Sequence, residues 1–363
     1  MAVAAMVLLI GAGATGLAWY TAVRLTDVQH VRPAYPLRVV AVGPGQRYVV
    51  LSRGPDAAEP GTFRLSWPGG QGLVSTVTAA SASSVTRRLT SVHGRLSAGQ
   101  AAGVQPDPYT GNPWQALHVR YRDVGVPGQL GPMPAWYVPG RLGTWAVVVH
   151  GLGGSRQDDL PAISLLHPLG FPVLAITYRN DIGAPASRDH LSHLGTTEWH
   201  DVGRAVTYAV DHGAKGVVLY GYSLGGAMSL VTAHDPAYAP YVRGIVMDSP
   251  LLSWGGTLDF QAGRVHLPGF VATLVAEMAT WRTGADLSMF SEHALQQDLS
   301  MPALLYQGTA DRVVPAYLAG RFARADRRLV TYVPVRGADH VSELGADPAL
   351  YRSALLRFMR RFR

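Results

Sequence analysis

Short apolar runs separated by stretches with helical periodicity limit the folds open to this chain more than any other feature. Such runs are typical of strands that are buried on both faces of a sheet. Strands that alternate with helices form a parallel sheet with helices on both sides. The sequence therefore predicts an α/β fold with a mostly parallel central sheet, and functional side chains beyond the carboxyl ends of its strands. The runs occupy residues 145–149, 172–177, 216–220, 244–247, 303–306 and 329–333, with helical patterns between them, as at 197–211 and 224–232.

One of these runs ends in a serine between glycines. Gly221-Tyr222-Ser223-Leu224-Gly225 follows the run at 216–220 and precedes a helical pattern. A serine on a sharp turn from strand to helix needs neighbours without bulk, which Gly221 and Gly225 provide. The start of a helix also favours negative charge near the serine. The spacing predicts that Ser223 is a nucleophile.

A base and an acid follow at later strand ends. Asp311 comes just after the run at 303–306, and His340 lies on a short loop after the last run. We expect His340 to accept the serine proton, and Asp311 to orient the imidazole and stabilise its charged form. Asp248, which follows the run at 244–247, is the main rival for the acid, although Asp311 is favoured. Asp339, beside the base, is interpreted as a loop residue.

A glycine-rich loop after the first run predicts an oxyanion hole. His150-Gly151-Leu152-Gly153-Gly154 follows the run at 145–149. At this place a backbone N–H can stabilise a developing oxyanion, and a second N–H is expected from Leu224, just after the nucleophile. We assign the first donor to Leu152, with Gly153 as the alternative. The competing interpretation is a flexible loop that is merely rich in glycine.

The N-terminus predicts a membrane segment at residues 1–24. Residues 1–23 carry no charge and approach the ~20 apolar residues that cross a bilayer, with Trp19 and Tyr20 near the end. A cleaved signal peptide, and hence a secreted protein, is the alternative. The side of the membrane stays open, because Arg24 and later arginines follow the segment and none precedes it. The G-x-G-x-x-G pattern at 11–16 lacks the strand, helix and acidic residue of a nucleotide site.

The remaining residues divide into two regions. Residues 37–108 predict a small β-rich accessory region, with strands at 38–42, 48–51, 62–67 and 85–89. Residues 109–363 predict the catalytic domain, which is expected to open with a strand pair at 116–121 and 134–138. The stretch 251–298 is longer than a simple connection. It is either an apolar lid over the site or an ordinary helix packed on the sheet.

Composition excludes several kinds of chemistry. The chain has no cysteine, which excludes disulfides and thiolate sites. His190 and His193 have no second ligand pair, so neither a metal nor a cofactor is expected. The formal net charge is +7, but the arginines are scattered and no recognition motif accompanies them, so no nucleic-acid partner is expected. A basic C-terminal tail leaves a role at a membrane surface open, and the oligomeric state is unknown.

These motifs, taken in order, resemble the α/β-hydrolase superfamily from Ala116 to the C-terminus. The chain looks most like its bacterial esterase and serine-aminopeptidase-like branch, which includes membrane-anchored Bem46-type hydrolases. Tyr178-Arg179-Asn180-Asp181 and the helix start at 197–201 fit that branch. The resemblance implies a serine hydrolase that acts by acyl transfer through a Ser-His-Asp triad, without a cofactor, on a small ester or acyl substrate. A carboxylesterase or lipase-like enzyme is favoured. A serine peptidase or aminopeptidase, a thioesterase and a non-catalytic membrane-anchored scaffold are the alternatives.

Overall fold

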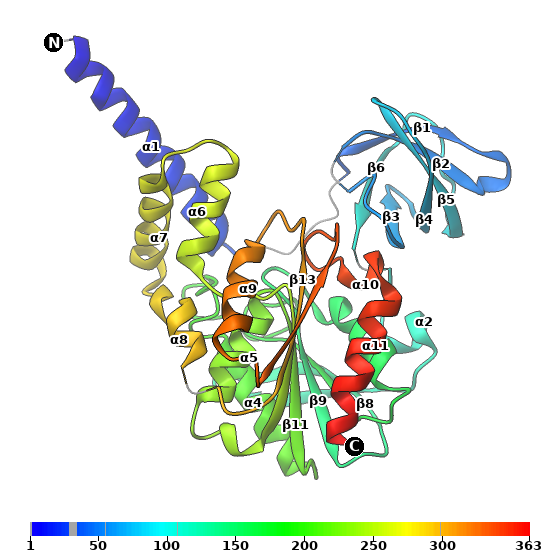
Figure 1. Ribbon diagram of the computed structural model, residues 1–363, viewed down its shortest axis with the longest axis vertical. Coiled ribbons are helices and arrows are strands. Elements are labelled where there is room, and N and C mark those ends of the chain that lie inside the picture. Colours follow the sequence, from blue (N-terminus) through cyan, green and yellow to red (C-terminus); the bar gives the residue numbers. More distant parts are fainter. Residues whose placement is uncertain (1, 29–34, 55, 107, 298) are drawn as a thin grey trace.

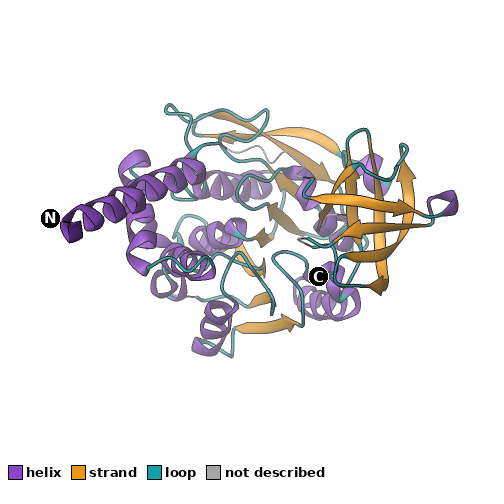
Figure 2. Ribbon diagram, turned by 90° about the horizontal axis from the view of Figure 1, so that it is seen from above, coloured by secondary structure: helices purple, strands orange, loops and turns teal. Residues whose placement is uncertain are grey.

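The structure is a computed structural model that describes residues 2–28, 35–54, 56–106, 108–297 and 299–363, with the backbone alone for residues 2–12. It consists of a long N-terminal helix, a β-barrel and a larger domain built on a sheet (Figure 1). The barrel and the N-terminal helix lie at opposite ends of the molecule when it is seen from above (Figure 2).

The predicted β-rich region is a closed barrel, in the strand order β1-β2-β5-β4-β3-β6. Its strands are β1 (Leu37–Val42), β2 (Tyr48–Ser52), β3 (Phe63–Trp67), β4 (Gly70–Ala80), β5 (Ser84–His93) and β6 (Ala101–Gln105). Closure through the β1–β6 pair leaves no free sheet edge. Alternate residues point inward, and Leu51, Phe63, Leu65 and Trp67 fill a core separate from that of the larger domain. The sequence indicated four of these strands and missed β4 and β6.

The predicted parallel sheet is present, in the order β14-β13-β12-β11-β9-β10-β8-β7. Its strands are β7 (Arg122–Gly128), β8 (Gly131–Val138), β9 (Thr144–Val149), β10 (Val173–Ile176), β11 (Gly216–Tyr222), β12 (Val242–Asp248), β13 (Ala303–Gly308) and β14 (Val330–Val335). Strands β9 to β14 are parallel, whereas β8 pairs antiparallel with both β7 and β10. All of the predicted apolar runs are strands of this sheet.

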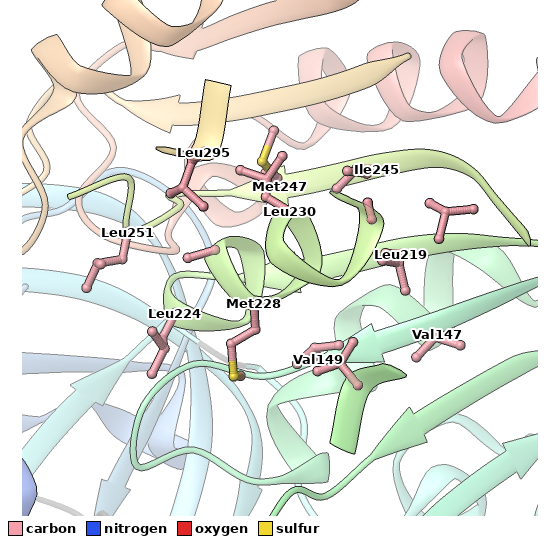
Figure 3. Packing of buried hydrophobic residues seen from close by; sticks show 14 of the residues in the cluster. Val147, Val149, Leu219, Leu224, Met228, Leu230, Ile245, Met247, Leu251 and Leu295 are labelled. Carbon is pink, nitrogen blue, oxygen red and sulfur yellow. The ribbon is translucent and has the colours of Figure 1, made fainter. Parts of the chain in front are cut away.

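Helices cover both faces of the sheet, because the central strands expose apolar side chains on each side. Helices α4, α5 and α9 contribute to one core cluster, and α3 and α11 to the other. Figure 3 shows Met228 beside Val149 in the first cluster. The bounds are α3 (Leu160–Leu166), α4 (Trp199–Asp211), α5 (Leu224–His234), α9 (Ala316–Ala325), α10 (Glu343–Ala346) and α11 (Pro348–Met359).

The prediction of a strand at 116–121 was wrong. Residues Pro113–Leu117 form helix α2, which begins at the N-cap Asn112. The Asn112 side chain accepts from the Gln115 amide and the Gln115 side chain accepts from the Asn112 amide, a reciprocal cap that nucleates a helix. The antiparallel pair that opens the larger domain is instead β7 with β8.

The stretch 251–298 contains three helices: α6 (Trp254–Arg264), α7 (Gly269–Thr283) and α8 (Glu292–Gln296). The N-terminal helix α1 (Ala2–Thr26) packs along α7 (Figure 1), with the rings of Trp19 and Trp281 5.8 Å apart. Helix α1 overlaps the predicted membrane segment. In the part of the chain whose side chains the structure describes, no helix has the length and apolar character to cross a bilayer.

Candidate active site

The turn between β11 and α5 holds Ser223 in a strained backbone conformation. Its φ of 50° and ψ of −117° are uncommon for a residue with a side chain. A Cβ on Gly221 would overlap the Gly225 carbonyl, and one on Gly225 would overlap the Val149 carbonyl. Both positions therefore require glycine, which explains the G-x-S-x-G spacing. The Ser223 amide donates to the Asp248 carbonyl at 2.9 Å, which ties the turn to β12.

The structure brings the three predicted triad residues together. His340 Nε2 lies 3.0 Å from Ser223 Oγ, and His340 Nδ1 lies 2.9 Å from Asp311 Oδ2. Asp311 is buried, and its other oxygen accepts from the amides of Val313 and Val314 at 2.7 and 2.9 Å. With both carboxylate oxygens bonded, Asp311 is held in place to orient the imidazole.

The electrostatics of the pair favour a charged imidazole beside a charged carboxylate. Burial lowers the pKa of His340, but the charge of Asp311 and its hydrogen bond outweigh burial and raise the pKa above the ordinary 6.5. Burial raises the pKa of Asp311, but His340 and the two amides lower it by more, to below the ordinary 3.8. Each group stabilises the charged form of the other.

The loop after β9 presents the backbone of Gly151 and Leu152 to Ser223. A Cβ on Gly151 would lie 3.1 Å from Ser223 Cβ, so the loop and the turn that carries Ser223 touch there. The Gly151 carbonyl accepts from Tyr178 Oη at 2.7 Å and from the Gly154 amide at 3.1 Å. Since a trans peptide points its N–H away from its C=O, the Leu152 N–H is directed away from these partners. It donates no hydrogen bond among those of the described residues.

The second expected donor is the amide of Leu224. This residue is the first of α5, and the first N–H groups of a helix have no partner inside the helix. Leu152, Ser223, Leu224 and His340 all line one cavity. Gly153 lines the same cavity, so Leu152 as the partner of Leu224 in an oxyanion hole stays a prediction, with Gly153 as the alternative.

His150 holds this loop in place, a role that the sequence did not reveal. It is fully buried, with Nε2 2.9 Å from Asp181 Oδ2 and Nδ1 2.9 Å from the Gly151 carbonyl. Both ring nitrogens thus face acceptors, which only the doubly protonated imidazolium satisfies. Burial lowers the pKa of His150, but Asp181 outweighs burial and raises it to about 9. The Gly-rich loop could be found from the sequence, but its clamp comes from Tyr178, 27 positions from Gly151, and Asp181, 31 positions from His150.

The rival acid Asp248 lies in a different network. Its Oδ2 accepts from Tyr351 Oη at 2.6 Å, and none of its hydrogen bonds among the described residues reaches His340. Burial raises the pKa of Asp248 to about 6.

Buried Glu343, which the sequence did not single out, accepts from Ser249 Oγ at 2.5 Å and from the Gly308 amide at 2.6 Å. Burial and Asp248 raise the pKa of Glu343 well above its ordinary range, so this carboxyl favours its neutral form behind the triad.

A cavity of about 1470 Å³ opens over the serine. It is larger than the ~300–1,000 Å³ usual for small-molecule sites. The α6 side chains Trp254 and Leu258 line it, whereas α7 packs against α1. Residues of the barrel line it as well.

The described residues contain one group that could hold a metal ion: Asp56, Glu59 and Asp339, whose ligand atoms lie within 4.8 Å of one another. The Arg312 guanidinium already pairs with both Asp56 and Asp339. The group is therefore an ion-pair network between the barrel and the loop that carries His340.

Comparison with known proteins covers both regions. The profile of a family described as "alpha/beta hydrolase fold" matches residues 145–352, and that of a domain of unknown function (DUF8805) matches residues 38–105. No curated protein matches the chain.

Solved structures share the fold of the larger domain. An esterase from Pyrococcus furiosus has a TM-score of 0.57 and 18% identity, over 70% of this chain and 95% of its own. A hyperthermophilic esterase from Pyrobaculum calidifontis has a TM-score of 0.50 and 20% identity, over 67% and 87%. Thermogutta terrifontis esterase 2, phosphoramylated by tabun, has a TM-score of 0.50 and 17% identity, over 66% and 94%. Because the matching profile spans more than half of the chain, this protein belongs to the α/β hydrolase fold family.

Proposed function

We propose that this protein is a serine hydrolase that cleaves carboxylic esters by acyl transfer, with Ser223 as nucleophile, His340 as base and Asp311 as the orienting acid. One observation carries the proposal. An unbroken chain of contacts joins Asp311 to His340 at 2.9 Å and His340 to Ser223 at 3.0 Å. The serine sits on a strained turn at the floor of an open cavity.

The reaction proceeds in two halves. His340 Nε2 takes the proton of Ser223 as Oγ attacks the carbonyl carbon, and the Leu152 and Leu224 amides donate to the oxyanion. The intermediate expels the alcohol, which receives the proton from His340. Water then attacks the acyl-enzyme while His340 takes its proton. Collapse of the second intermediate releases the acid and returns the proton to Ser223.

Esters are favoured over other acyl substrates because the solved structures that share the fold include proteins named as esterases. One of them is phosphoramylated by tabun, an organophosphorus compound. The same triad can cleave thioesters and amides, so a thioesterase or a serine peptidase is the rival activity. The match to Tyr178-Arg179-Asn180-Asp181 favours the Bem46-type branch within the family.

Labelling by a fluorophosphonate probe tests the activated serine. We expect the wild type to be labelled and both Ser223→Ala and His340→Ala to lose labelling, because the probe reacts with a serine whose proton has a base to accept it. Ser83→Ala in the barrel and His212→Ala at the surface are matched controls that should label like the wild type.

The wild type and these variants then distinguish ester hydrolysis from the rival activities. A panel of butyryl ester, thioester and aminoacyl-amide substrates should give the highest kcat/KM on the ester. A folded wild type that resists the probe would contradict catalysis and favour a scaffold. A higher kcat/KM on the thioester or the amide would replace the ester in the proposal.

We also propose that the N-terminal segment attaches the protein to a membrane. Residues 1–23 carry no charge, α1 is continuous from Ala2 to Thr26, and Trp19 and Tyr20 are exposed near its end. The full-length chain should therefore remain in the membrane pellet after alkaline carbonate extraction. A variant with both Leu8→Lys and Leu9→Lys should be released. Equal release of both proteins would contradict the anchor.

A further inference from the structure

The barrel is joined to the two loops that carry the triad. Arg312, which directly follows Asp311, pairs with Asp56 of the barrel and with Asp339, which directly precedes His340. The Asp339 amide donates to Glu59 Oε1 of the barrel at 3.0 Å. A Cβ on Gly61 would overlap the Gly345 backbone, so the two parts of the chain touch there.

A buried arginine keeps this barrel loop in shape. The Arg87 guanidinium, inside the barrel, donates to the carbonyls of Ala57 at 3.3 Å, Glu59 at 2.8 Å and Gly61 at 2.7 Å. Because three carbonyls of one loop share one rigid fork, the loop is preorganised to hold its contacts with the catalytic loops. The barrel is thus fixed beside the active site.

The cavity over Ser223 lies between the barrel and α6, and its two sides differ in chemistry. Figure 1 shows the barrel and the pair of α6 and α7 on opposite sides of the upper edge of the sheet. Most side chains that line the part near α1 and α6 are apolar, although Thr257 and Gln261 also lie there. Most of those from the barrel are polar or charged, although Leu73 and Val104 also lie there. The apolar residues are Leu25, Leu224, Leu251, Trp254 and Leu258, and the polar or basic barrel residues are Arg64, Gln71, Ser91, His93 and Gln105.

The chemistry of acyl transfer orients a substrate between these two sides. His340 delivers a proton to the leaving alcohol, so the alcohol must lie next to His340. The loop of His340 contacts the barrel through Asp339, and the neighbouring Asp311 loop contacts it through Arg312. The acyl group, on the other side of the serine, then points toward the apolar wall beside Leu224 and Trp254.

From this arrangement we infer that the barrel is the alcohol-binding part of the active site, and that the substrates are esters of an apolar acyl group with a large, polar alcohol. The inference rests on the proposed serine hydrolase function. It assigns a role to a domain whose family is described only as of unknown function. The large cavity volume agrees with a substrate that has a substantial group on each side of the ester bond.

Three butyryl esters test the inference, since they share one acyl group and differ in the alcohol: methyl butyrate, 6-O-butyryl maltose and the butyryl ester of glycerol 3-phosphate. The wild type should show a higher kcat/KM on at least one of the two polar esters than on methyl butyrate. For each polar ester, the relevant ratio is its kcat/KM divided by the kcat/KM for methyl butyrate. In Arg64→Gln and in His93→Gln this ratio should fall about three- to tenfold, as expected for the loss of one hydrogen bond to the substrate. A fall for the maltose ester indicates a neutral alcohol, and a fall for the glycerol 3-phosphate ester indicates an anionic one.

Arg88→Gln is the matched control, because Arg88 lies on the same strand as His93 and is exposed but does not line the cavity. It should keep the wild-type ratio. His93 is exposed, so its substitution does not threaten the fold. If methyl butyrate were the best substrate and neither barrel variant changed the ratio, the inference would be overturned. Fluorophosphonate labelling of the same wild-type protein would then show that the proposed hydrolase function still stood.

Discussion

At the scale of single residues, the site depends on one serine held in an unfavourable backbone conformation. A positive φ at a residue other than glycine or asparagine costs about 1–3 kcal/mol, so the surroundings must enforce it. The Ser223 amide donates to Asp248 and the Ser223 carbonyl accepts from Leu251 at 3.1 Å. The flanking glycines allow the close approach of the chain on both sides.

Replacing Gly225 by alanine should unfold or distort this turn. The added methyl group would overlap the carbonyls of Val149 and His150, so the free energy of unfolding should fall by about 1–3 kcal/mol and probe labelling should be lost. Gly263→Ala is the matched control. Its Cβ meets nothing within 4 Å, and alanine in a helix should raise the free energy of unfolding by about 0.5–1 kcal/mol. Urea unfolding compares the two, and equal stability of Gly225→Ala and wild type would contradict the steric argument.

The pH dependence of labelling distinguishes the two candidate acids. Only neutral His340 can accept the serine proton, and its pKa is raised above 6.5, so the labelling rate should rise with a midpoint above 6.5. Asp311→Asn removes the largest influence that raises this pKa, so the midpoint should move down and the rate should fall by about 10⁴-fold. Asp248→Asn should leave the midpoint nearly in place. The reverse pattern would make Asp248 the acid.

At the scale of elements, the loop after β9 is the clearest case of a catalytic segment shaped by distant partners. Its glycines let the backbone approach Ser223, but the direction of the Leu152 N–H follows from the clamp on the Gly151 carbonyl. His150, Tyr178 and Asp181 come from the ends of two neighbouring strands. Their contacts position the expected oxyanion donor without any of them touching Ser223.

The His150–Asp181 pair should make stability depend on pH. The folded-state pKa of His150 is raised from 6.5 to about 9, so its contribution is complete below about 6.5 and is lost as the pH rises through about 9. Asp181→Asn should cost ~3–5 kcal/mol at pH 6, as for a broken buried pair, and less above pH 9. Urea unfolding at both pH values measures the difference. A constant difference would contradict a charged His150.

At the scale of the whole molecule, the barrel and the larger domain meet at the triad. Asp56 and Glu59 of one part contact Arg312 and Asp339 of the other. The Asp56–Arg312 pair joins opposite charges across the junction, whereas Glu59 accepts from the backbone amide of Asp339. The ion pair is partly exposed, so alone it contributes little. Their importance lies in position, because they border both Asp311 and His340.

Removing the central cation should loosen this junction. In Arg312→Gln, Asp56 and Asp339 would face each other without a counter-charge, so amide hydrogen exchange should become faster at residues 56–61 and at 337–342, and kcat should fall. Arg321→Gln is the matched control, because Arg321 is exposed and, among the described residues, forms its ion pair with Glu292 rather than with the barrel. Unchanged exchange in Arg312→Gln would mean that the barrel is held by other contacts.

Local sequence patterns determined the presence of a parallel sheet, the order of its strands and helices along the chain, and the types of side chain at the strand ends. The six short apolar runs of the larger domain all form strands of the sheet, and the steric demands of the turn at Ser223 can be read from Gly221 and Gly225 alone. The exception is residues 113–117. There the reciprocal cap of Asn112 and Gln115 nucleates a helix in a stretch whose apolar residues suggested a strand.

Only the tertiary structure decided which acid meets His340, how the Gly151 loop is clamped, and that the barrel borders the site. Asp311 and Asp248 each follow a strand of the same sheet, and it is the path of the His340 loop that brings one within 2.9 Å. The barrel residues Asp56 and Glu59 lie about 280 positions from Asp339 in the chain. Contacts at such separations depend on packing and mutual burial, which periodicity and short motifs do not encode.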